Sequence, residues 1–275
     1  MPELPEVEHI ARSLRRGGRG HDGVVGLKLE MFSVVCPKLK IGGRADLVPR
    51  LASAGLVDID RRGKYLRLRF SEADIVLHLR MTGDVIVVDP ETTESPRHER
   101  LQLKLSNGRN LVLDDPRRLA EVWVVDEGAW PRADIADDPL EPSWSPSELH
   151  WRLGSLRRPL KIALLDQTVI SGLGNIWVDE TLHRAKIHPS RIACSLSIEE
   201  ARQLLEAART VLQSAIIDLE DAGLVWAHRG GFRGPLPGRV YGRGGGPCPD
   251  CGASLHSLRI GGRTTTVCDG CQPLR

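Results

Sequence analysis

The chain has 275 residues, of which 41% are hydrophobic and 27% charged, and its formal net charge is only +2. This length is sufficient for two ordinary domains with buried cores. No stretch approaches the roughly 18 apolar residues of a membrane span, and glutamates interrupt the first apolar run, which argues against a signal peptide. We therefore expect a cytoplasmic protein with no membrane partner.

Positive charge gathers in two segments of this nearly neutral chain. Residues 229–275 hold seven arginines against two aspartates, and residues 61–69 read RRGKYLRLR. Local basic surfaces of this kind suit a polyanionic partner such as nucleic acid. A solubilising surface is the alternative explanation for the C-terminal segment.

The first predicted element is a helix near the N-terminus. Apolar residues recur there with helical spacing, and the pair Gly17–Gly18 is expected to end the helix. Its buried face is predicted to consist of Val7, Ile10, Ala11 and Leu14.

The residues in front of this helix carry reactive groups. Removal of Met1, which is usual before a small residue, would leave Pro2 with a free secondary amine. An α-amino group titrates at about 8, against about 10.4 for lysine, so more of it is nucleophilic at neutral pH. Its attack on an aldehyde-like carbon gives a charged iminium, which promotes elimination of neighbouring groups. Glu3 is placed to act as a general acid or base, whereas Glu6 also fits the acidic first turn of a helix.

Residues 23–125 show the alternating pattern that is typical of short strands. The predicted strands read GLKLEM, GKYLRLRF, DIVLHLRM, DVIVV, RLQLKL and NLVL. Asn107–Gly108 between the last two predicts a hairpin. Many short strands separated by turn residues predict a β-sandwich or a barrel-like domain.

Two turns in this region carry candidate functional residues. Met81 lies beside the turn of HLRMTG, and Arg118 and Leu119 follow the Asp-Pro of DDPRRL. A core methionine and an ordinary loop arginine would also explain these positions.

Helices are predicted to follow. Residues 131–146 are rich in proline and acids and predict an interdomain linker, and helical periodicity then extends to about residue 222. Ser197 and Glu200 fit a capping box at the start of the last long helix. Gly223 fits the position just past its end.

A Gly-x-Gly turn precedes another helix of this region. Gly172 and Gly174 permit a tight turn, and Asn175 would open the helix. Backbone N–H groups at such a helix start can bind an anion such as phosphate. Most turns of this kind are only structural, so the motif leaves both interpretations open.

Four of the six cysteines lie near the C-terminus in two Cys-x-x-Cys pairs separated by sixteen residues. The four are Cys248, Cys251, Cys268 and Cys271. Two such pairs offer four thiolates in a tetrahedron, which suits one structural Zn²⁺ with no open position for catalysis. An intracellular chain favours metal over the alternative of two disulfides. Arg263 would lie near the tip of a hairpin inside this module, where it can contact a phosphate.

Together these motifs resemble one family, the formamidopyrimidine-DNA glycosylases with the related endonuclease VIII enzymes. The matching segments are PELPEVE, RRGKYL, HLRMTG, DDPRR, LLDQTVISGLGNIWVDETLHRAKIHP and VYGRGGGPCPDC…GGRTTTVCDGC. They span the whole chain in the family's order, and PELPEVE is more similar to the formamidopyrimidine branch than to endonuclease VIII.

The resemblance implies an α+β multidomain fold and a DNA partner. Its expected parts are an N-terminal helix plus β-sandwich over residues 1–130, a linker over 131–146, a helix–two-turn–helix domain over 147–235 and a zinc-finger β-hairpin over 240–275. The expected protein is a monomer that clamps double-stranded DNA containing a damaged base or an abasic site. It would act in base excision repair, on DNA of the nucleoid.

The resemblance also implies a bifunctional glycosylase and abasic-site lyase. Pro2 would attack C1′ of the damaged nucleotide and expel the base, while Glu3 protonates the opening sugar ring. Glu6 would help to shape the pocket. The resulting imine would then promote β- and δ-elimination, which cuts the strand on both sides of the sugar.

Further residues would hold the DNA around a nucleotide that is flipped out of the stack. The expected phosphate contacts are Lys64, His78, Asn175 and Arg263, which position the backbone without reading its sequence. The residues expected to fill the gap in the duplex are Met81, Arg118 and Leu119. Arg118 would face the orphaned base.

Three positions depart from the family's pattern. Arg80 stands where the family usually has glycine, and Leu119 stands where it usually has phenylalanine. The segment before Val240 is much shorter than the loop with which the formamidopyrimidine branch covers an oxidised purine. A shorter loop would favour ring-opened purines or oxidised pyrimidines over 8-oxoguanine. An endonuclease VIII-like preference and a damage-binding clamp without base excision are therefore the alternative functions, although the presence of Pro2, Glu3 and Lys64 argues against the clamp.

Overall fold

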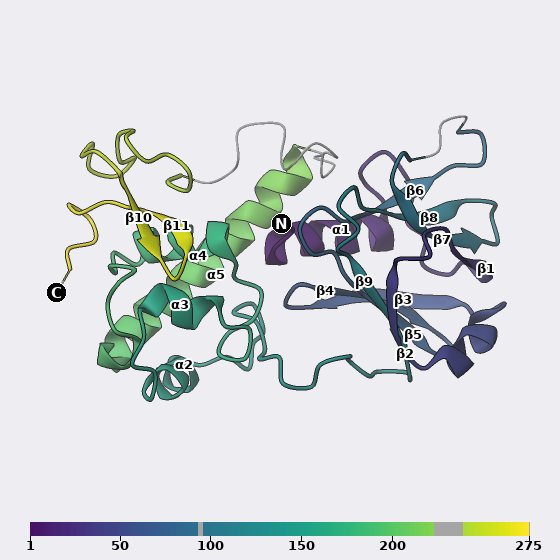
Figure 1. Cartoon of the computed structure of the whole chain (residues 1–275), viewed down its shortest axis with the longest axis horizontal. Coiled ribbons are helices and arrows are strands. Elements are labelled where there is room, and N and C mark those ends of the chain that lie inside the picture. Colours follow the sequence, from purple (N-terminus) through teal and green to yellow (C-terminus); the bar gives the residue numbers. More distant parts are fainter. Residues whose placement is uncertain (93–95, 223–238, 275) are drawn as a thin grey trace. The chain divides into compact units, whose positions relative to one another are not determined.

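A computed structural model describes residues 1–92, 96–222 and 239–274 (Figure 1). Two compact units divide the chain after Ala133. The first contains Met1–Ala133 and the described residues 219–222 at the end of the last long helix. The second contains Asp134–Asp218 together with the described C-terminal residues from 239 onward.

The first unit begins with helix α1, Leu4–Arg16. Glu3 is its N-cap and forms a capping box with Glu6, whose carboxylate accepts the Glu3 backbone N–H at 2.8 Å. Such reciprocal bonds satisfy backbone donors that a helix start leaves open. The predicted apolar face is confirmed, since each of its four residues is at most 2% exposed. The helix ends at Gly17, whose φ of +95° is a left-handed geometry that glycine tolerates.

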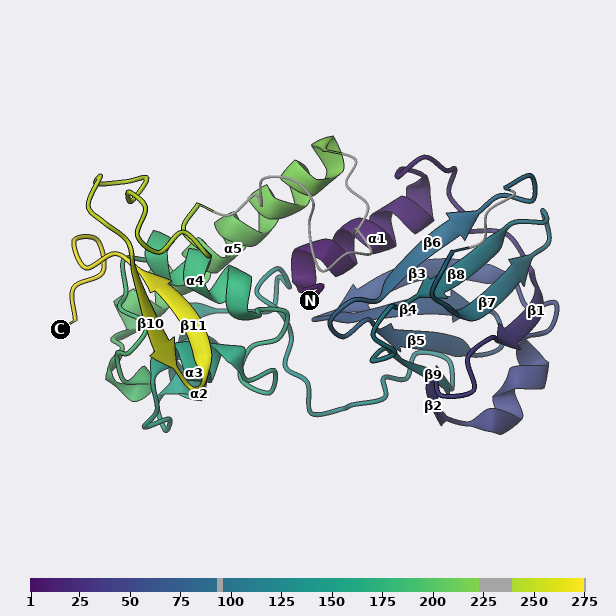
Figure 2. The same cartoon turned by 45° about the horizontal axis from the view of Figure 1, so that its top comes forward.

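Two sheets form the rest of the first unit (Figure 2). One has the order β1–β7–β8–β6, and its strands are Leu29–Val34, Glu99–Leu105, Asn110–Asp114 and Asp84–Val88. The other has the order β2–β9–β5–β4–β3, and its strands are Lys40–Gly43, Glu121–Val125, Asp74–His78, Tyr65–Phe70 and Leu56–Arg62. Their facing apolar side chains and those of α1 form one core, and the predicted sandwich is confirmed. A 3-10 helix, Ala45–Leu51, packs against it.

The predicted hairpin at Asn107–Gly108 is confirmed. Gly108 has a φ of +83°, and the Leu105 N–H donates to the Arg109 carbonyl at 2.8 Å. Strands β2, β3 and β9 are not among the six predicted strands. β2 contains two glycines and β3 four charged residues, which weakens the alternating apolar signal in both.

The second unit is helical up to the C-terminal hairpin. Its elements are α2 Pro146–Leu153, α3 Leu160–Leu165, α4 Asn175–Arg184, the 3-10 helix Ala193–Ser195, α5 Ile198–Asp221, β10 His256–Ile260 and β11 Arg263–Val267. The predicted capping box is confirmed, since Ser197 and Glu200 exchange bonds of 3.2 and 2.8 Å. Gly223 and the segment GGFRGPLPG lie outside the described residues. No described helix is long and apolar enough to span a membrane.

The predicted linker carries buried side chains. Ile135, Ala136 and Asp138 are at most 6% exposed, and the Ala136 N–H donates to the Gln167 carbonyl at 3.0 Å. These residues belong to the second compact unit. The four domain boundaries given above stay a prediction.

Helix α4 attaches the C-terminal module to the helical part of the second unit. Asp179 pairs with Lys161 at 2.6 Å and accepts the Thr266 backbone N–H at 2.9 Å, and both charged side chains are fully buried. Lys161 also donates to the Thr264 carbonyl at 3.1 Å. Next to this pair, the Glu180 carboxylate accepts the backbone N–H groups of residues 239, 240 and 241. The hairpin is therefore fixed to α3 and α4 by buried polar contacts.

Candidate functional site

The N-terminus of the first unit is enclosed by charged side chains. Pro2 is buried, Glu3 and Glu6 are 2% and 3% exposed, and Lys64 is 6% exposed in the turn between β3 and β4. Burial lowers the pKa of the Met1 α-amino group, Lys64 and Arg117 lower it further, and the two glutamates oppose them. The structure thus brings together groups from α1, from the β3–β4 turn and from the loop after β8.

This arrangement favours a nucleophilic amine. Lowering the pKa of an amine raises the fraction that carries a free lone pair near neutral pH. The capping box holds the two carboxylates within the first helical turn, next to the amine. A nucleophile, two carboxylates and a buried cation are the groups that covalent attack on a carbon with a departing group requires.

His78, at the end of β5, extends this cluster. Its ring packs edge-on against Tyr65 of β4, with centroids 4.7 Å apart, and is 8% exposed. Burial lowers its pKa to about 3, with Arg80 and Lys64 acting in the same direction, so the imidazole is neutral at physiological pH. The Arg80 backbone N–H donates to Nδ1 at 3.2 Å. The ring proton is therefore on Nε2, which makes this atom a donor for an oxygen acceptor such as phosphate.

Two turns present exposed apolar side chains. Met81 is 41% exposed and Leu119 is 39% exposed. Each directly follows an arginine with left-handed backbone geometry, Arg80 with φ +54° and Arg118 with φ +57°. Arg118 is itself exposed. Met81 is therefore an exposed residue beside a turn and not a core methionine.

Asp115 joins these two turns. Its fully buried carboxylate accepts the hydroxyl of Thr82 from one turn and the backbone N–H groups of Arg117, Leu119 and Ala120 from the other. The sequence analysis did not single out Asp115. The signal that was available is its place directly before Pro116, because aspartate often orders the backbone of the turn that follows it.

In the second unit, Asn175 and the predicted hairpin tip lie close together. Asn175 is the first residue of α4, and its amide donates to the Thr264 carbonyl at 3.1 Å. Arg263 precedes Thr264 and is exposed directly after the Gly261–Gly262 turn. A Cβ at Gly261 would meet Ile162 of α3 at 2.2 Å, so the turn packs tightly on the helical part.

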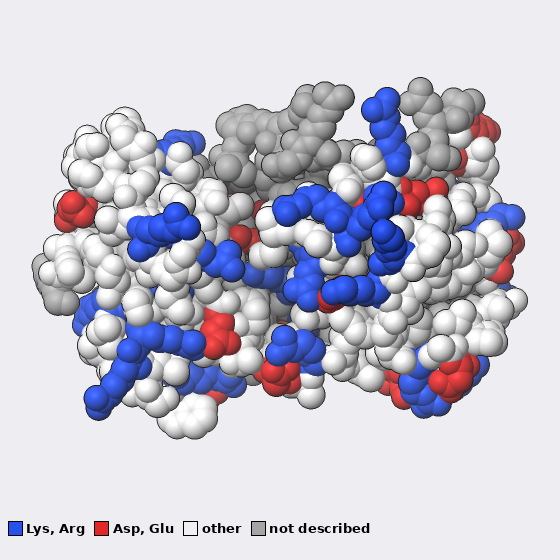
Figure 3. Space-filling view, in the orientation of Figure 1, with Lys and Arg blue, Asp and Glu red and all other residues white. Residues whose placement is uncertain are grey.

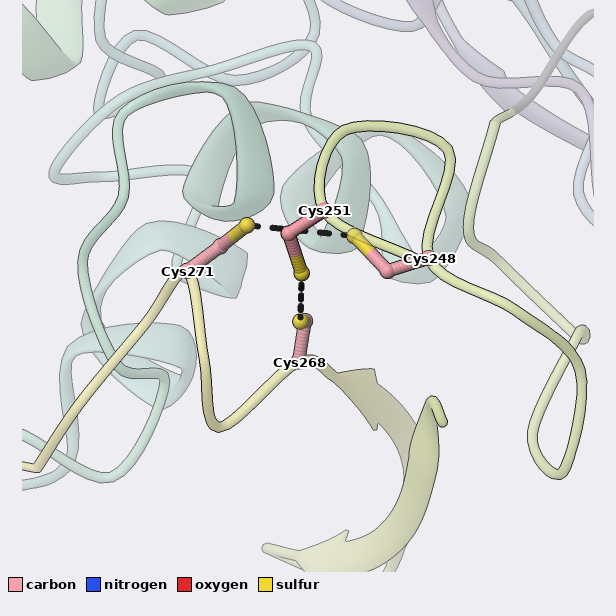
Figure 4. A group of neighbouring side chains, drawn as sticks. All are labelled: Cys248, Cys251, Cys268 and Cys271. Carbon is pink, nitrogen blue, oxygen red and sulfur yellow. Dashed lines mark hydrogen bonds between the residues drawn. The ribbon is translucent and has the colours of Figure 1, made fainter. Parts of the chain in front are cut away.

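The four C-terminal cysteines converge on one point (Figure 4). Their sulfur atoms all lie within 4.8 Å of one another, with Cys248–Cys271 at 3.8 Å and Cys251–Cys268 at 3.5 Å. Zn–S bonds of about 2.3 Å in a tetrahedron place the sulfurs about 3.8 Å apart. All four cysteines are free thiols rather than disulfides. The donor set and its spacing fit one structural zinc ion.

A buried histidine supports this zinc site. His183 of α4 is 2% exposed, and its Nε2 lies 3.2 Å from the Cys248 sulfur. An N–H donor to a ligating thiolate orients the ligand and stabilises its charge. Sequence analysis missed His183, because its spacing from the cysteines gives no signal.

Comparisons with known proteins cover the whole chain. Residues 1–122 match the formamidopyrimidine-DNA glycosylase N-terminal domain, 135–223 the H2TH domain of the same enzymes, and 245–274 the zinc finger found in FPG and IleRS. The formamidopyrimidine-DNA glycosylase of Thermomicrobium roseum is 36% identical over 100% of both chains. The chain belongs to the formamidopyrimidine-DNA glycosylase family. The Chloroflexus aurantiacus member is also 36% identical, over 99% of this chain and 98% of its own.

Solved structures of the family share this fold. The MutM (FPG) protein of Thermus thermophilus is 34% identical, with a TM-score of 0.80 over 98% of both chains. The Lactococcus lactis FPG in complex with DNA containing Fapy-dG is 28% identical, with a TM-score of 0.83 over 99% of this chain and 100% of its own. The family recognised from the sequence motifs is therefore confirmed, as is the α+β multidomain fold.

Proposed function

We propose that this chain is a bifunctional DNA glycosylase and abasic-site lyase that removes oxidised bases from duplex DNA in base excision repair. The observation that carries the proposal is the buried Pro2 beside Glu3, Glu6 and Lys64, at a terminus where burial lowers the pKa of the Met1 amine, in a chain with all three domains of the family. Its setting is the cytoplasm, on DNA of the nucleoid.

The proposed chemistry begins once Met1 has been removed. The Pro2 lone pair attacks C1′ of the flipped nucleotide, and the base leaves with the electrons of its bond to C1′ and takes up the proton that the amine loses. The nitrogen lone pair then breaks the bond between C1′ and the ring oxygen, which Glu3 protonates as the ring opens. The resulting iminium draws electrons from C2′, so loss of a C2′ proton expels the 3′ phosphate. A second elimination expels the 5′ phosphate. Glu6 holds the Glu3 backbone N–H at 2.8 Å, which keeps the acid in place.

Phosphate contacts complete the site. In the first unit, Lys64 supplies a buried positive charge and neutral His78 donates from Nε2. In the second unit, Asn175 and Arg263 present donors at the start of α4 and at the hairpin tip. Lysine and arginine side chains also gather around the start of α1 on the face drawn in Figure 3. These contacts position a DNA backbone without reading its sequence.

The exposed turns supply the groups that replace the flipped nucleotide. Met81 and Leu119 are apolar, exposed and carried by hydrogen-bonded turns, as insertion between bases requires. Arg118 is the residue that faces the orphaned base. Leu119 stacks less well than an aromatic ring. The short segment before Val240 supports a second candidate function, an endonuclease VIII-like preference for oxidised pyrimidines or ring-opened purines.

Borohydride trapping tests the proposal. The substrates are duplexes with an abasic site, 8-oxoguanine, a formamidopyrimidine or an oxidised pyrimidine. We expect a covalent adduct with the abasic duplex, at least about a hundred-fold weaker in Pro2→Gly, because the nucleophile then lacks its ring. The same variant should still bind damaged DNA.

The outcomes separate the candidate functions. The lesion that gives the fastest adduct identifies the preferred base. If protein that lacks Met1 and contains zinc forms no adduct with any duplex, the chain is a damage-binding clamp without base excision. Loss of DNA binding in Pro2→Gly would contradict the nucleophile assignment.

A further inference from the structure

The backbone of Arg80 has a geometry that arginine seldom adopts. Its φ of +54° lies in the left-handed region, which favours glycine. Arg80 lies two residues after His78, the end of β5, and directly before Met81. A side chain at this position therefore needs a compensating contact, and the structure provides one.

That contact is Glu121, the first residue of β9. The Arg80 guanidinium donates to one Glu121 oxygen from Nε at 3.2 Å and from Nη2 at 2.5 Å. Lys40 lies 3.4 Å from the other oxygen. The Glu121 side chain is 14% exposed, and strand pairing places it opposite His78. β9 therefore fixes the arginine side chain at a rigid point of the five-stranded sheet.

The same turn is fixed at two further points. The Arg80 backbone N–H is bonded to His78, and the Thr82 hydroxyl is bonded to Asp115. Met81 is the residue between these anchors whose side chain points into solvent at 41% exposure. Without the Arg80–Glu121 pair, the turn keeps the Thr82–Asp115 bond after Met81. It loses the contact that joins the residue before Met81 to β9.

We propose that the Arg80–Glu121 ion pair is a positioning device that presets the Met81 side chain for insertion into damaged DNA. This inference rests on the proposed function. Arg80 acts through Met81 and not as a phosphate ligand, because its guanidinium is occupied by a carboxylate at two donors. Ordering the turn before binding removes the entropy that a loose turn would lose on insertion.

Two variants and one matched control test this role. Arg80→Gly relieves the left-handed backbone and removes the ion pair, and Glu121→Gln removes the charge from the other side. Arg44→Ala is the control, because Arg44 pairs with Asp46 and Asp126 in the same unit, beyond the far end of β9. The probe is a duplex with an uncleavable abasic analogue and 2-aminopurine beside it, whose fluorescence reports unstacking by an inserted side chain.

We expect both variants to weaken binding about three- to five-fold, the scale of one partly exposed ion pair. The 2-aminopurine signal should fall in both, while the maximal rate of borohydride trapping stays at the wild-type value and Arg44→Ala changes nothing. In a Met81→Ala background, Arg80→Gly should have no further effect on affinity, because the pair acts through that side chain.

Two results would overturn the inference. One is additivity of Arg80→Gly and Met81→Ala. The other is a weaker salt dependence of DNA binding in Arg80→Gly alone, by about one charge, with unchanged 2-aminopurine fluorescence. That result would make Arg80 a phosphate contact. Failure of the proposed function is distinguishable, because wild-type protein would then bind the analogue duplex without forming any adduct on a natural abasic site.

Discussion

At the scale of single residues, the candidate site depends on burial that lowers the pKa of an amine and of a histidine. The terminal amine and His78 both lie in the first unit, and burial is the largest cause of the lowered pKa in each. The result differs between them. An amine at this terminus is more available as a nucleophile near neutral pH, while His78 is a neutral donor at physiological pH.

The pH dependence of trapping follows from the amine. Because burial, Lys64 and Arg117 outweigh Glu3 and Glu6, the pKa of the Met1 amine is below its usual value of about 8. We expect the Pro2 amine that is exposed by removal of Met1 to be shifted in the same direction by the same surroundings. An amine attacks only when it is deprotonated, so the trapping rate should rise with pH and level off at a lower pH than for a model peptide that begins with proline. Rates measured from pH 5 to 9 at saturating abasic duplex check this.

Lys64→Met is the matched comparison for that profile. Lys64 is a cation that lowers the pKa of the amine, so its removal should raise that pKa. The acid limb of the profile, which is the part where the rate rises with pH, should then move toward higher pH. His78, with a pKa of about 3, should contribute no step between pH 5 and 8. An acid limb at the position of the peptide reference would contradict the argument from burial.

At the scale of elements, the structure shows which parts of the site the sequence reveals. Helix α1, the Asn-Gly hairpin and the capping box of α5 follow from local patterns, because their stabilising groups are neighbours in the chain. Asp115 and His183 could not be found in this way. Their partners Thr82 and Cys248 are distant in sequence, so only the packing of turns and helices brings them together.

The buried pair Lys161–Asp179 is the strongest link between the helices and the hairpin. We expect Lys161→Met to cost about 3–5 kcal/mol at pH 8, because it leaves a fully buried carboxylate without its cation. Burial raises the pKa of Asp179 to about 6, although Lys161 opposes the shift. Stability from this group is therefore fully present below about pH 4 and is lost as the pH rises through about 6.

The loss in Lys161→Met should accordingly be larger at pH 8 than at pH 5, where the carboxyl takes up a proton. Urea unfolding at both pH values measures it. The double variant Lys161→Met with Asp179→Asn is the control and should recover most of the stability. Equal losses of unfolding free energy at the two pH values would show that Asp179 does not carry an unpaired charge in the variant at pH 8.

At the scale of the whole molecule, the two units supply different parts of one function. The first holds the amine, its carboxylates and the exposed turns, and the second holds the hairpin, Asn175 and the zinc site. The family and the zinc ligands were readable from sequence, since they depend on short motifs with fixed spacing. The domain boundaries stay a prediction, and buried residues such as Ile135 and Asp138 lie in the segment whose prolines and acids indicate a linker.

This division predicts how loss of zinc acts. Cys268→Ser should release the metal, because three thiolates remain and Cys268 is itself fully buried beside the hairpin. Arg263 then loses its fixed position, so affinity for all duplexes should fall at least about ten-fold while the acid limb of trapping at saturating DNA keeps its pH. Metal analysis and binding isotherms check both parts. Ser195, which lies in the second unit away from the four thiols, offers Ser195→Ala as a control that should keep its zinc. Full metal content in Cys268→Ser would contradict a four-thiolate site, and a shifted acid limb would show that the amine's environment depends on the zinc module.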